Sequence, residues 1–209
     1  SARVDHFVAN SNHVRRRIEK YYRRDAAVIH PPVDTDFFQP AAVPSRGYFL
    51  LVSALVPYKN AAAVVAACSE LKERLLVVGQ GTERRALGRL AGPACEFLPA
   101  VSAEKLRELY QNARALVFAG VEDFGIAFAE SQACATPVIA LDRGGVRDIV
   151  IDRATGLLYA DATVAGLKKA IADFSRLDLS GAVIRENSLR FSAARFRAEL
   201  EQFIRARTR

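Results

Sequence analysis

Short apolar runs alternate with longer helical patterns through most of this chain. From residue 46 onward, the apolar runs are rich in β-branched and aromatic residues, and the segments between them have the spacing of helices of ten to fifteen residues. The predicted strands are YFLLVSA, RLLVVG, CEFL, ALVFA, VIAL and GLLYA, and the helices between the first five cover residues 61–72, 83–90, 103–112 and 126–135. This alternation predicts an α/β fold with a doubly wound parallel sheet and helices on both faces.

The two ends of the chain depart from this alternation. Residues 4–30 predict a strand, a helix that begins after Asn10 and Ser11 and runs through Arg24, and a second short strand. Residues 31–44 contain too many prolines for a regular element, so we expect a linker there and a division into residues 1–44 and 45–209. After residue 141 we expect a turn, a short helix to about residue 150, helices over 164–174 and 193–205, and a turn near Gly181.

Composition narrows the class of protein. The chain has 209 residues, 51% of them hydrophobic, without the apolar run of about 18 residues that a membrane span needs, which indicates a soluble globular protein. Its net charge of +7 suits anionic partners such as nucleotides, nucleic acid or acidic lipids, although a basic solvated surface explains it equally well. The chain contains no Met, even at position 1, so we expect a piece of a longer protein.

The cysteines and histidines do not form a recognisable metal or disulfide pattern. Cys68, Cys95 and Cys134 are an odd number without CxxC spacing, which is typical of reduced, packed thiols in a cytosolic protein. The three histidines lack ligand spacing, so we predict no metal site.

Three loops at predicted strand ends carry the candidate chemistry. ALVPYKN places Lys59 at a helix start, QGTE follows the second strand, and VEDFG follows the fourth. Parallel strands bring such loops to one edge of the sheet, where a Lys, glycine turns and helix N-termini suit a diphosphate. A surface lysine is the alternative for Lys59. The GxGxxG and GxxxxGK[ST] patterns are absent, which argues against dinucleotide oxidoreductases and P-loop proteins.

Glu122 and Glu130 form the second candidate feature. Seven residues separate them, so in one continuous helix they would lie about 80° apart around the axis and could face one cleft. Paired carboxylates can divide labour at a sugar, one stabilising charge at the reacting carbon and the other binding hydroxyls. The alternative is a polar loop residue and a helix-surface residue.

The order and spacing of these motifs resemble those of a known protein family. VSALVPYKN, VVGQGTERRAL, the stretch from FLPAVSAEKL to ESQACATPVIA, GGVRDIV and TGLL resemble the nucleotide-binding domain of retaining GT-B glycosyltransferases of family 4, especially mannosyltransferase-like bacterial members. Residues 1–44 resemble the end of the acceptor domain and the interdomain linker, and residues 45–209 resemble the C-terminal, donor-binding domain.

The resemblance implies a role for each site residue. Glu122 would lie near the donor sugar as the catalytic stabiliser, Glu130 would hold the ribose hydroxyls, and Lys59 would bind the phosphates. The remaining donor-binding residues are implied to be Ser53, Gly79, Gln80, Val101, Phe124, Gly125 and Ile126. Family members need no metal cofactor, because cationic side chains and a helix dipole stabilise the leaving diphosphate.

Two departures qualify the resemblance. Ala54 stands where family members usually carry Arg, which would share the diphosphate with Lys59. By the same resemblance, the chain would also include only a short part of an acceptor domain.

We therefore hypothesise a cytoplasmic enzyme of polysaccharide biosynthesis, the donor-binding half of a retaining hexosyltransferase. It would move mannose from GDP-mannose, or a sugar from a UDP-sugar, to a glycan or lipid-linked acceptor, with an N-terminal acceptor domain as partner. The arginines of residues 15–17 are compatible with peripheral contact at the inner face of the membrane. The alternatives are a degenerate nucleotide-binding or assembly domain and a nucleic-acid binder; the sequence lacks the interleaved basic and aromatic residues that the last would need.

Overall fold

A computed structural model describes residues 3–207 and contains two sheets, both parallel. The larger has six strands in the order β5-β4-β3-β6-β7-β8. Its strands are β3 (Tyr48–Val52), β4 (Leu75–Val78), β5 (Cys95–Leu98), β6 (Ala113–Phe118), β7 (Val138–Leu141) and β8 (Gly156–Tyr159). The predicted α/β fold with a doubly wound parallel sheet is confirmed.

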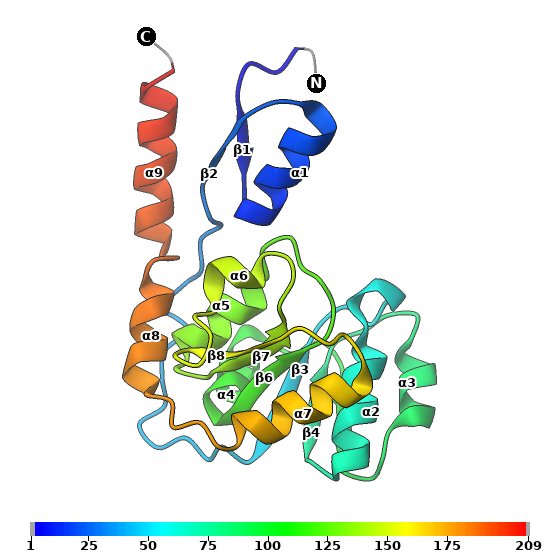
Figure 1. The fold of residues 1–209 in the computed structure, drawn as a ribbon. Coiled ribbons are helices and arrows are strands. Elements are labelled where there is room, and N and C mark those ends of the chain that lie inside the picture. The colour runs from blue at the N-terminus through cyan, green and yellow to red at the C-terminus, as the bar shows by residue number, and fades with distance from the viewer. Residues whose placement is uncertain (1–2, 208–209) are drawn as a thin grey trace.

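Helices cover both faces of this sheet (Figure 1). They are α2 (Ala61–Leu71), α3 (Arg84–Leu90), α4 (Ala103–Asn112), α5 (Ile126–Ala133), α6 (Val146–Ile149), α7 (Val164–Phe174) and α8 (Gly181–Leu189), with a 3-10 helix at Pro57–Lys59. Helix α2 packs against α7, and α5 packs against α4 and α8. We call this sheet with its helices the six-stranded unit.

A small unit precedes the linker. Strands β1 (Phe7–Ala9) and β2 (Ala26–Val28) pair in parallel on either side of helix α1 (Asn12–Tyr22) in the sequence, as predicted. Its buried cluster contains Ala9, Ile18 and Ala26. We call residues 7–28 the N-terminal unit.

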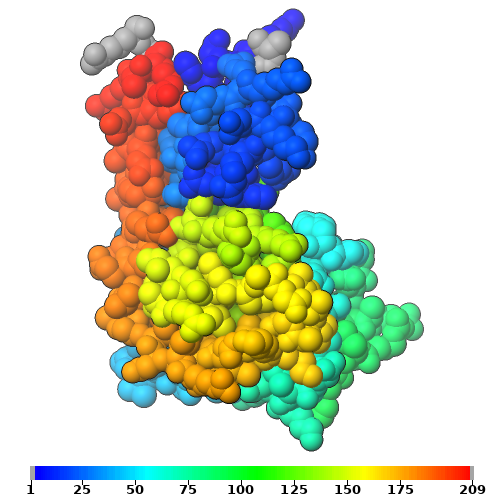
Figure 2. Space-filling model, viewed as in Figure 1, coloured from blue at the N-terminus to red at the C-terminus, as the bar shows by residue number. Residues whose placement is uncertain are grey.

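The last helix, α9 (Ala193–Arg205), returns to the N-terminal unit. It runs alongside β1 and β2 in Figure 1, and the ring of Phe203 lies 6.3 Å from the ring of His6. Figure 2 shows the N-terminal residues and α9 together above the six-stranded unit. The first and last elements of the chain therefore lie on the same side of the molecule.

Capping residues mark several of the predicted helix ends, and two predictions in the terminal segments are wrong. Thr163 and Ser192 accept hydrogen bonds from the first turns of α7 and α9, and both helices have the predicted ends. The predicted turn near Gly181 is wrong, because Ser180 caps a helix, α8, that begins at that glycine. Helix α1 ends at Tyr22, two residues earlier than predicted, because Arg23 adopts a left-handed conformation with φ of 52°.

The core of the six-stranded unit lies on both faces of its central strands. Phe49, Leu116 and Ile139 are at most 1% exposed. Cys68 and Cys134 are also buried and Cys95 is partly buried, which agrees with the predicted packing of these side chains. All three are free thiols. Within the described part of the chain, no helix is both long and apolar enough to cross a lipid bilayer.

Candidate active site

The chain reverses its direction of winding between β3 and β6. From β3 it continues to β4 and β5 on one side, whereas from β6 it continues to β7 and β8 on the other. The helices that follow β3 and β6 therefore run back on opposite faces of the sheet, and the crevice in which doubly wound sheets bind ligands is expected at the carboxyl edge between them.

The loops after β3 and β6 touch backbone to backbone. A Cβ atom added to Gly120 would lie 2.6 Å from the carbonyl oxygen of Lys59, so only glycine fits there. Asn60 adds a hydrogen bond from its Nδ2 to the carbonyl oxygen of Ala119, at 3.3 Å. This contact fixes the end of the 3-10 helix that carries Lys59 against the loop that carries Glu122.

Lys59 and Glu122 form an ion pair across the crevice. The Nζ atom of Lys59 lies 2.5 Å from both carboxylate oxygens of Glu122. The side chains are 15% and 22% exposed, so the pair is shielded yet open to an incoming ligand. Charge-assisted hydrogen bonds of this kind are strong, and a phosphate could compete for the same ammonium group.

Glu122 lines a cavity of about 330 Å³ between the six-stranded unit and the N-terminal unit. Its lining residues are Asn10, Pro31, Val52, Phe118, Glu122, Asp123, Phe124, Gly125, Ile126, Ala127 and Phe128. The predicted residues Phe124, Gly125 and Ile126 are thus brought together with Glu122. Gly125, with φ of 99°, precedes the first residue of α5, so the cavity lies at the N-terminus of that helix.

Glu130 has different neighbours. It lies one turn into α5, where the hydroxyl of the buried Tyr110 donates a hydrogen bond to its Oε2 at 3.0 Å. Burial raises the pKa of the Glu130 carboxyl, and the Tyr110 hydrogen bond partly opposes that shift. Burial, with the adjacent Glu130 charge, also raises the pKa of Tyr110 well above its ordinary value. Glu130 is not among the residues that line the Glu122 cavity.

Ser53, Gly79 and Gln80 lie at the neighbouring strand ends, after β3 and β4. The Leu55 N–H donates to the carbonyl oxygen of Gln80 at 2.8 Å. A Cβ on Gly79, whose φ is 146°, would lie 1.9 Å from the carbonyl oxygen of Ser53. These residues are brought together by backbone contact. Val101 lies between β5 and α4 and packs against the large core.

Contacts from the N-terminal unit reach the same loop and were missed by the sequence analysis. The hydroxyl of Ser11 donates to the carbonyl oxygen of Asp123, while it also accepts from the Val14 N–H as the cap of α1. Arg17 pairs with the Asp123 carboxylate at 2.6 Å. The sequence signalled only the capping role of Ser11, because its second partner lies 112 residues away.

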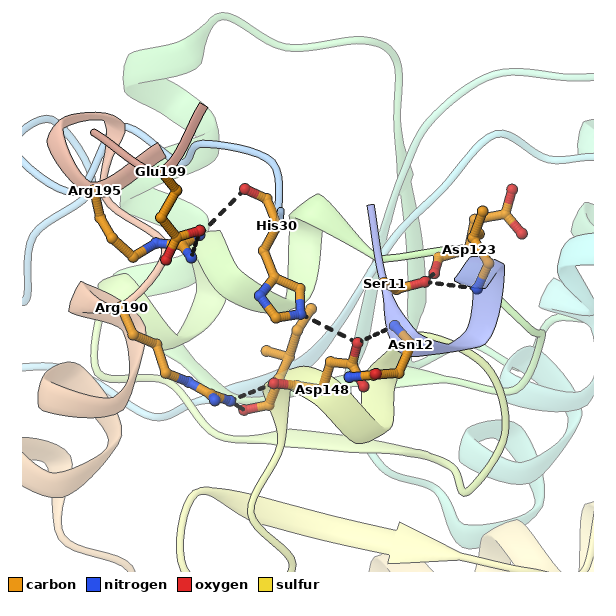
Figure 3. Close-up of polar contacts among 10 residues, drawn as sticks. Ser11, Asn12, His30, Asp123, Asp148, Arg190, Arg195 and Glu199 are labelled. Carbon is orange, nitrogen blue, oxygen red and sulfur yellow. Dashed lines mark hydrogen bonds and ion pairs between the residues drawn. The ribbon is translucent and has the colours of Figure 1, made fainter. Parts of the chain in front are cut away.

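A second set of contacts joins the units beside this loop (Figure 3). The Asp148 Oδ2 accepts from the Asn12 N–H at 2.6 Å and lies 3.2 Å from the Nε2 of His30. Arg190 donates to the Asp148 carbonyl oxygen, and the His30 ring lies 5.6 Å from the ring of Phe124. We call Asp148, Asn12, His30 and Arg190 the Asp148 cluster. It holds the N-terminal unit and the linker against the cavity wall.

Among residues 3–207, no three His, Cys, Asp or Glu side chains converge in a way that would hold a metal ion.

Comparison with known proteins identifies the family. Residues 32–190 match the family described as "Glycosyl transferases group 1". The chain belongs to this family. This match covers most of the six-stranded unit and the linker, including every predicted site residue of this group 1 glycosyltransferase chain.

Curated relatives agree with the family. The chain is 33% identical to the D-inositol 3-phosphate glycosyltransferase of Geodermatophilus obscurus, over 91% of this chain and 50% of that protein. It is 30% identical to the GDP-mannose-dependent alpha-(1-6)-phosphatidylinositol monomannoside mannosyltransferase of Mycolicibacterium smegmatis, over 78% of this chain and 51% of that one. The group 1 glycosyltransferase chain thus spans about half the length of these relatives.

Solved structures share the fold. The sucrose-phosphate synthase of Thermosynechococcus elongatus superposes with a TM-score of 0.86 at 24% identity, over 97% of this chain and 58% of the other. The Anabaena protein HepE, solved with UDP and glucose, gives a TM-score of 0.83 at 17% identity, over 96% and 63%. The group 1 glycosyltransferase chain therefore has the GT-B type of α/β fold.

Proposed function

We propose that this chain is the donor-binding, C-terminal part of a retaining hexosyltransferase of family 4. The observation that carries the proposal is the Lys59–Glu122 pair at the point where the sheet reverses its winding, in a chain that belongs to the group 1 glycosyltransferases. When a donor binds, the ammonium group of Lys59 can contact its diphosphate and the carboxylate of Glu122 its sugar, so that the ion pair separates.

Each candidate residue has a task in this proposal. Lys59 and the N-terminus of α5 stabilise the charge that develops on the leaving diphosphate. Glu122 stabilises the positive charge at the reacting sugar carbon during front-face attack. Because Lys59 and the helix dipole supply the positive charge, the proposed reaction needs no metal.

The nucleoside end of the donor lies further along the sheet edge. Glu130 holds the ribose hydroxyls, Gly79 and Gln80 approach the ribose, and Val101 lies beside the base. The separate surroundings of Glu130 and Glu122 support this division of labour, since one carboxylate contacts Tyr110 and the other contacts Lys59.

Mannose from GDP-mannose is the favoured donor, because a relative at 30% identity is named as dependent on it. A UDP-sugar is the second candidate, supported by the UDP and glucose in the Anabaena structure of the same fold.

The acceptor is a glycan or a lipid-linked sugar, and it is bound largely by an acceptor domain. The full enzyme works in the cytoplasm in polysaccharide biosynthesis, and the exposed Arg15, Arg16 and Arg17 favour peripheral contact with the inner face of the membrane. Nucleic acid is not a partner in this proposal.

One observation favours a second candidate, a degenerate nucleotide-binding or assembly domain. Ala54 lies in the loop after β3, where the family resemblance implies an Arg for the diphosphate. Ala54→Arg discriminates between the two. A gain in nucleotide affinity of about tenfold, from one added charged hydrogen bond, supports the transferase, whereas no gain supports the degenerate domain.

Calorimetric titration tests the proposal. GDP, GDP-mannose, UDP and UDP-glucose are titrated into the 209-residue chain, and we expect millimolar or tighter binding of at least one pair. Lys59→Ala and Glu130→Ala should each weaken binding about 10- to 100-fold, because each removes a hydrogen bond to or from a charged group. Lys168→Ala is the matched control, since Lys168 pairs with Glu70 on α2, away from the cavity.

Two results would overturn the assignment. Absence of binding for all four nucleotides at millimolar concentration contradicts the proposed function. Unchanged affinity in both Lys59→Ala and Glu130→Ala leaves the function standing but removes these residues from the site.

A further inference from the structure

Tyr58 is an exposed aromatic residue beside the Lys59–Glu122 pair, and the proposed function gives it no role. It is 71% exposed, so it contributes little to the core. It directly precedes Lys59 in the 3-10 helix after β3, and the Nζ atom of Lys59 lies 5.1 Å from the centroid of its ring. An ammonium group within about 6 Å of the centroid is attracted by the negative face of the ring, so this is a cation–π contact.

The backbone that carries this contact is fixed on both sides. Pro57 begins the 3-10 helix with a restricted φ, and the Asn60 N–H donates to the Pro57 carbonyl oxygen at 3.1 Å. The carbonyl group of Lys59 lies against Gly120, where a Cβ atom would come within 2.6 Å of its oxygen. The ring of Tyr58 and the aliphatic stem of Lys59 therefore extend from one segment of defined conformation.

The ammonium group of Lys59 has two partners of different kinds. The carboxylate of Glu122 accepts its hydrogen bonds at 2.5 Å, whereas the ring of Tyr58 attracts its charge without being a charged group itself. An ammonium group on a flexible four-carbon stem has many rotamers when nothing holds it. The carboxylate and the ring together hold the ammonium group at the crevice.

The two partners respond differently to a donor. In the proposed function, Glu122 leaves Lys59 and contacts the sugar, while the diphosphate takes its place at the ammonium group. The ring of Tyr58 has no charge to be neutralised and can stay where it is. Cation–π attraction is also stronger at desolvated sites than at exposed ones, so a ligand that excludes water from Lys59 strengthens this contact.

We propose that Tyr58 is a positioning residue, whose ring holds the ammonium group of Lys59 in place for the diphosphate of the donor. This inference rests on the proposed function and extends it, because it assigns a task to a residue that acts only through Lys59. A charged group that is already in position loses less conformational freedom when the ligand binds, and affinity rises accordingly.

Substitutions at position 58 separate the ring from its hydroxyl group and its apolar bulk. GDP, GDP-mannose, UDP and UDP-glucose are titrated into the 209-residue chain and each variant, with NMR chemical shifts as the measure of binding. Tyr58→Leu keeps an apolar side chain without a ring and should weaken binding about two- to fivefold, the value of an exposed cation–π contact. Tyr58→Phe keeps the ring and should bind as the wild type does. The loss should be equal for nucleoside diphosphate and nucleotide sugar, because both carry the diphosphate.

A double-mutant cycle tests whether the effect passes through Lys59. Lys59→Gln removes the positive charge, so the cation–π contact is absent in that background. Adding Tyr58→Leu to Lys59→Gln should then leave the affinity unchanged. A direct contact between Tyr58 and the nucleotide would instead give the same loss in both backgrounds.

Tyr21 on α1 offers a matched control. It is 69% exposed, and the Nζ atom of Lys20 lies 5.2 Å from the centroid of its ring, so the contact and its exposure resemble those of Tyr58. It lies roughly 15 Å along the helix axis from Ser11, the end of α1 that contacts the donor loop. Tyr21→Leu should bind every nucleotide as the wild type does. Thermal melts of all variants establish that they are folded.

The outcomes are distinct. An unchanged affinity in Tyr58→Leu, an equal loss in Tyr58→Phe, or a loss that persists in the Lys59→Gln background would each overturn the role of Tyr58. If Lys59→Gln binds as tightly as the wild type, Lys59 is outside the site, and this inference fails while the proposed function stands. A wild-type chain that binds none of the four ligands overturns the proposed function, and this inference with it.

Discussion

The six-stranded unit and the N-terminal unit are stabilised by different interactions. The former has a continuous apolar core on both sides of its central strands, with side chains such as Phe49 and Leu116 that are at most 1% exposed. The buried cluster of the latter contains Ala9, Ile18 and Ala26, beneath a sheet of two short strands. Two-stranded sheets are marginally stable alone. The position of the N-terminal unit over the cavity therefore depends on polar contacts at the interface.

The largest expected effect on the free energy of unfolding comes from truncating a side chain in the core of the six-stranded unit. Leu116→Ala should lower the free energy of unfolding by about 2–5 kcal/mol, because Leu116 lies in a central strand and is almost fully buried. Ile18→Ala, in the small cluster, should change this global value by less than about 1 kcal/mol while increasing amide exchange in residues 7–28. Urea denaturation and hydrogen exchange measure the two quantities. Equal global losses in both variants would show that the two units unfold as one, which breaks the comparison.

A smaller loss of stability should follow from disruption of the Asp148 cluster. Asp148→Ala removes the acceptor for the Asn12 N–H and the neighbour of His30, at a cost of about 1.5–3 kcal/mol for hydrogen bonds to a charged group. We expect faster amide exchange in β1 and β2 and unchanged exchange in β6.

Asp142→Ala is the control for that variant. Asp142 pairs with Arg147, whose side chain is 52% exposed, and surface pairs contribute about 0–1 kcal/mol. If Asp148→Ala leaves the exchange of β1 and β2 as slow as in Asp142→Ala, polar contacts do not hold the N-terminal unit in place.

The smallest expected effect is the pH dependence of stability that arises from Glu130. Because burial raises the Glu130 pKa above its ordinary value of 4.5, the folded state binds more protons than the unfolded state between these two pKa values. The stability contributed by protonated Glu130 is fully present below pH 4.5 and is lost as the pH rises through the folded pKa. Glu130→Gln removes this titration, so wild type should lose stability relative to the variant as the pH increases.

Urea denaturation of both proteins between about pH 4 and pH 8 measures the difference. A difference that is constant across this range would contradict the effect of burial on Glu130. A similar slope in Glu199→Gln, whose carboxylate pairs with Arg195 on α9, would show that the effect is not particular to Glu130.

Local sequence patterns were sufficient to predict most of the strands and helices of the six-stranded unit. Apolar runs predicted its strands, and capping residues such as Thr163 predicted the start of α7, because both signals act over a few residues. Helix α8 was missed because Gly181 resembles a turn residue, and the helix presents only Ile184 and Ser188 as buried residues.

The candidate site likewise has features that local sequence predicted and features that it did not. The loops that carry Lys59 and Glu122 could be predicted, because strand ends in a parallel sheet share one edge. The direct contact between the two side chains, 63 residues apart, could not be. The roles of Ser11, His30 and Asp148 also depend on contacts between distant segments, for which one sequence holds no local signal.

Within residues 3–207 two segments lead from the six-stranded unit to the side of the molecule that holds the N-terminal unit, one in the linker after β2 and one between α8 and α9 (Figure 1). The passages lie side by side, since the Val33 N–H donates to the Phe191 carbonyl oxygen at 2.8 Å and Val33 pairs with Ser192. Two segments that are hydrogen-bonded to each other cannot move independently, so any change in the position of the N-terminal unit over the six-stranded unit has to bend both of them together.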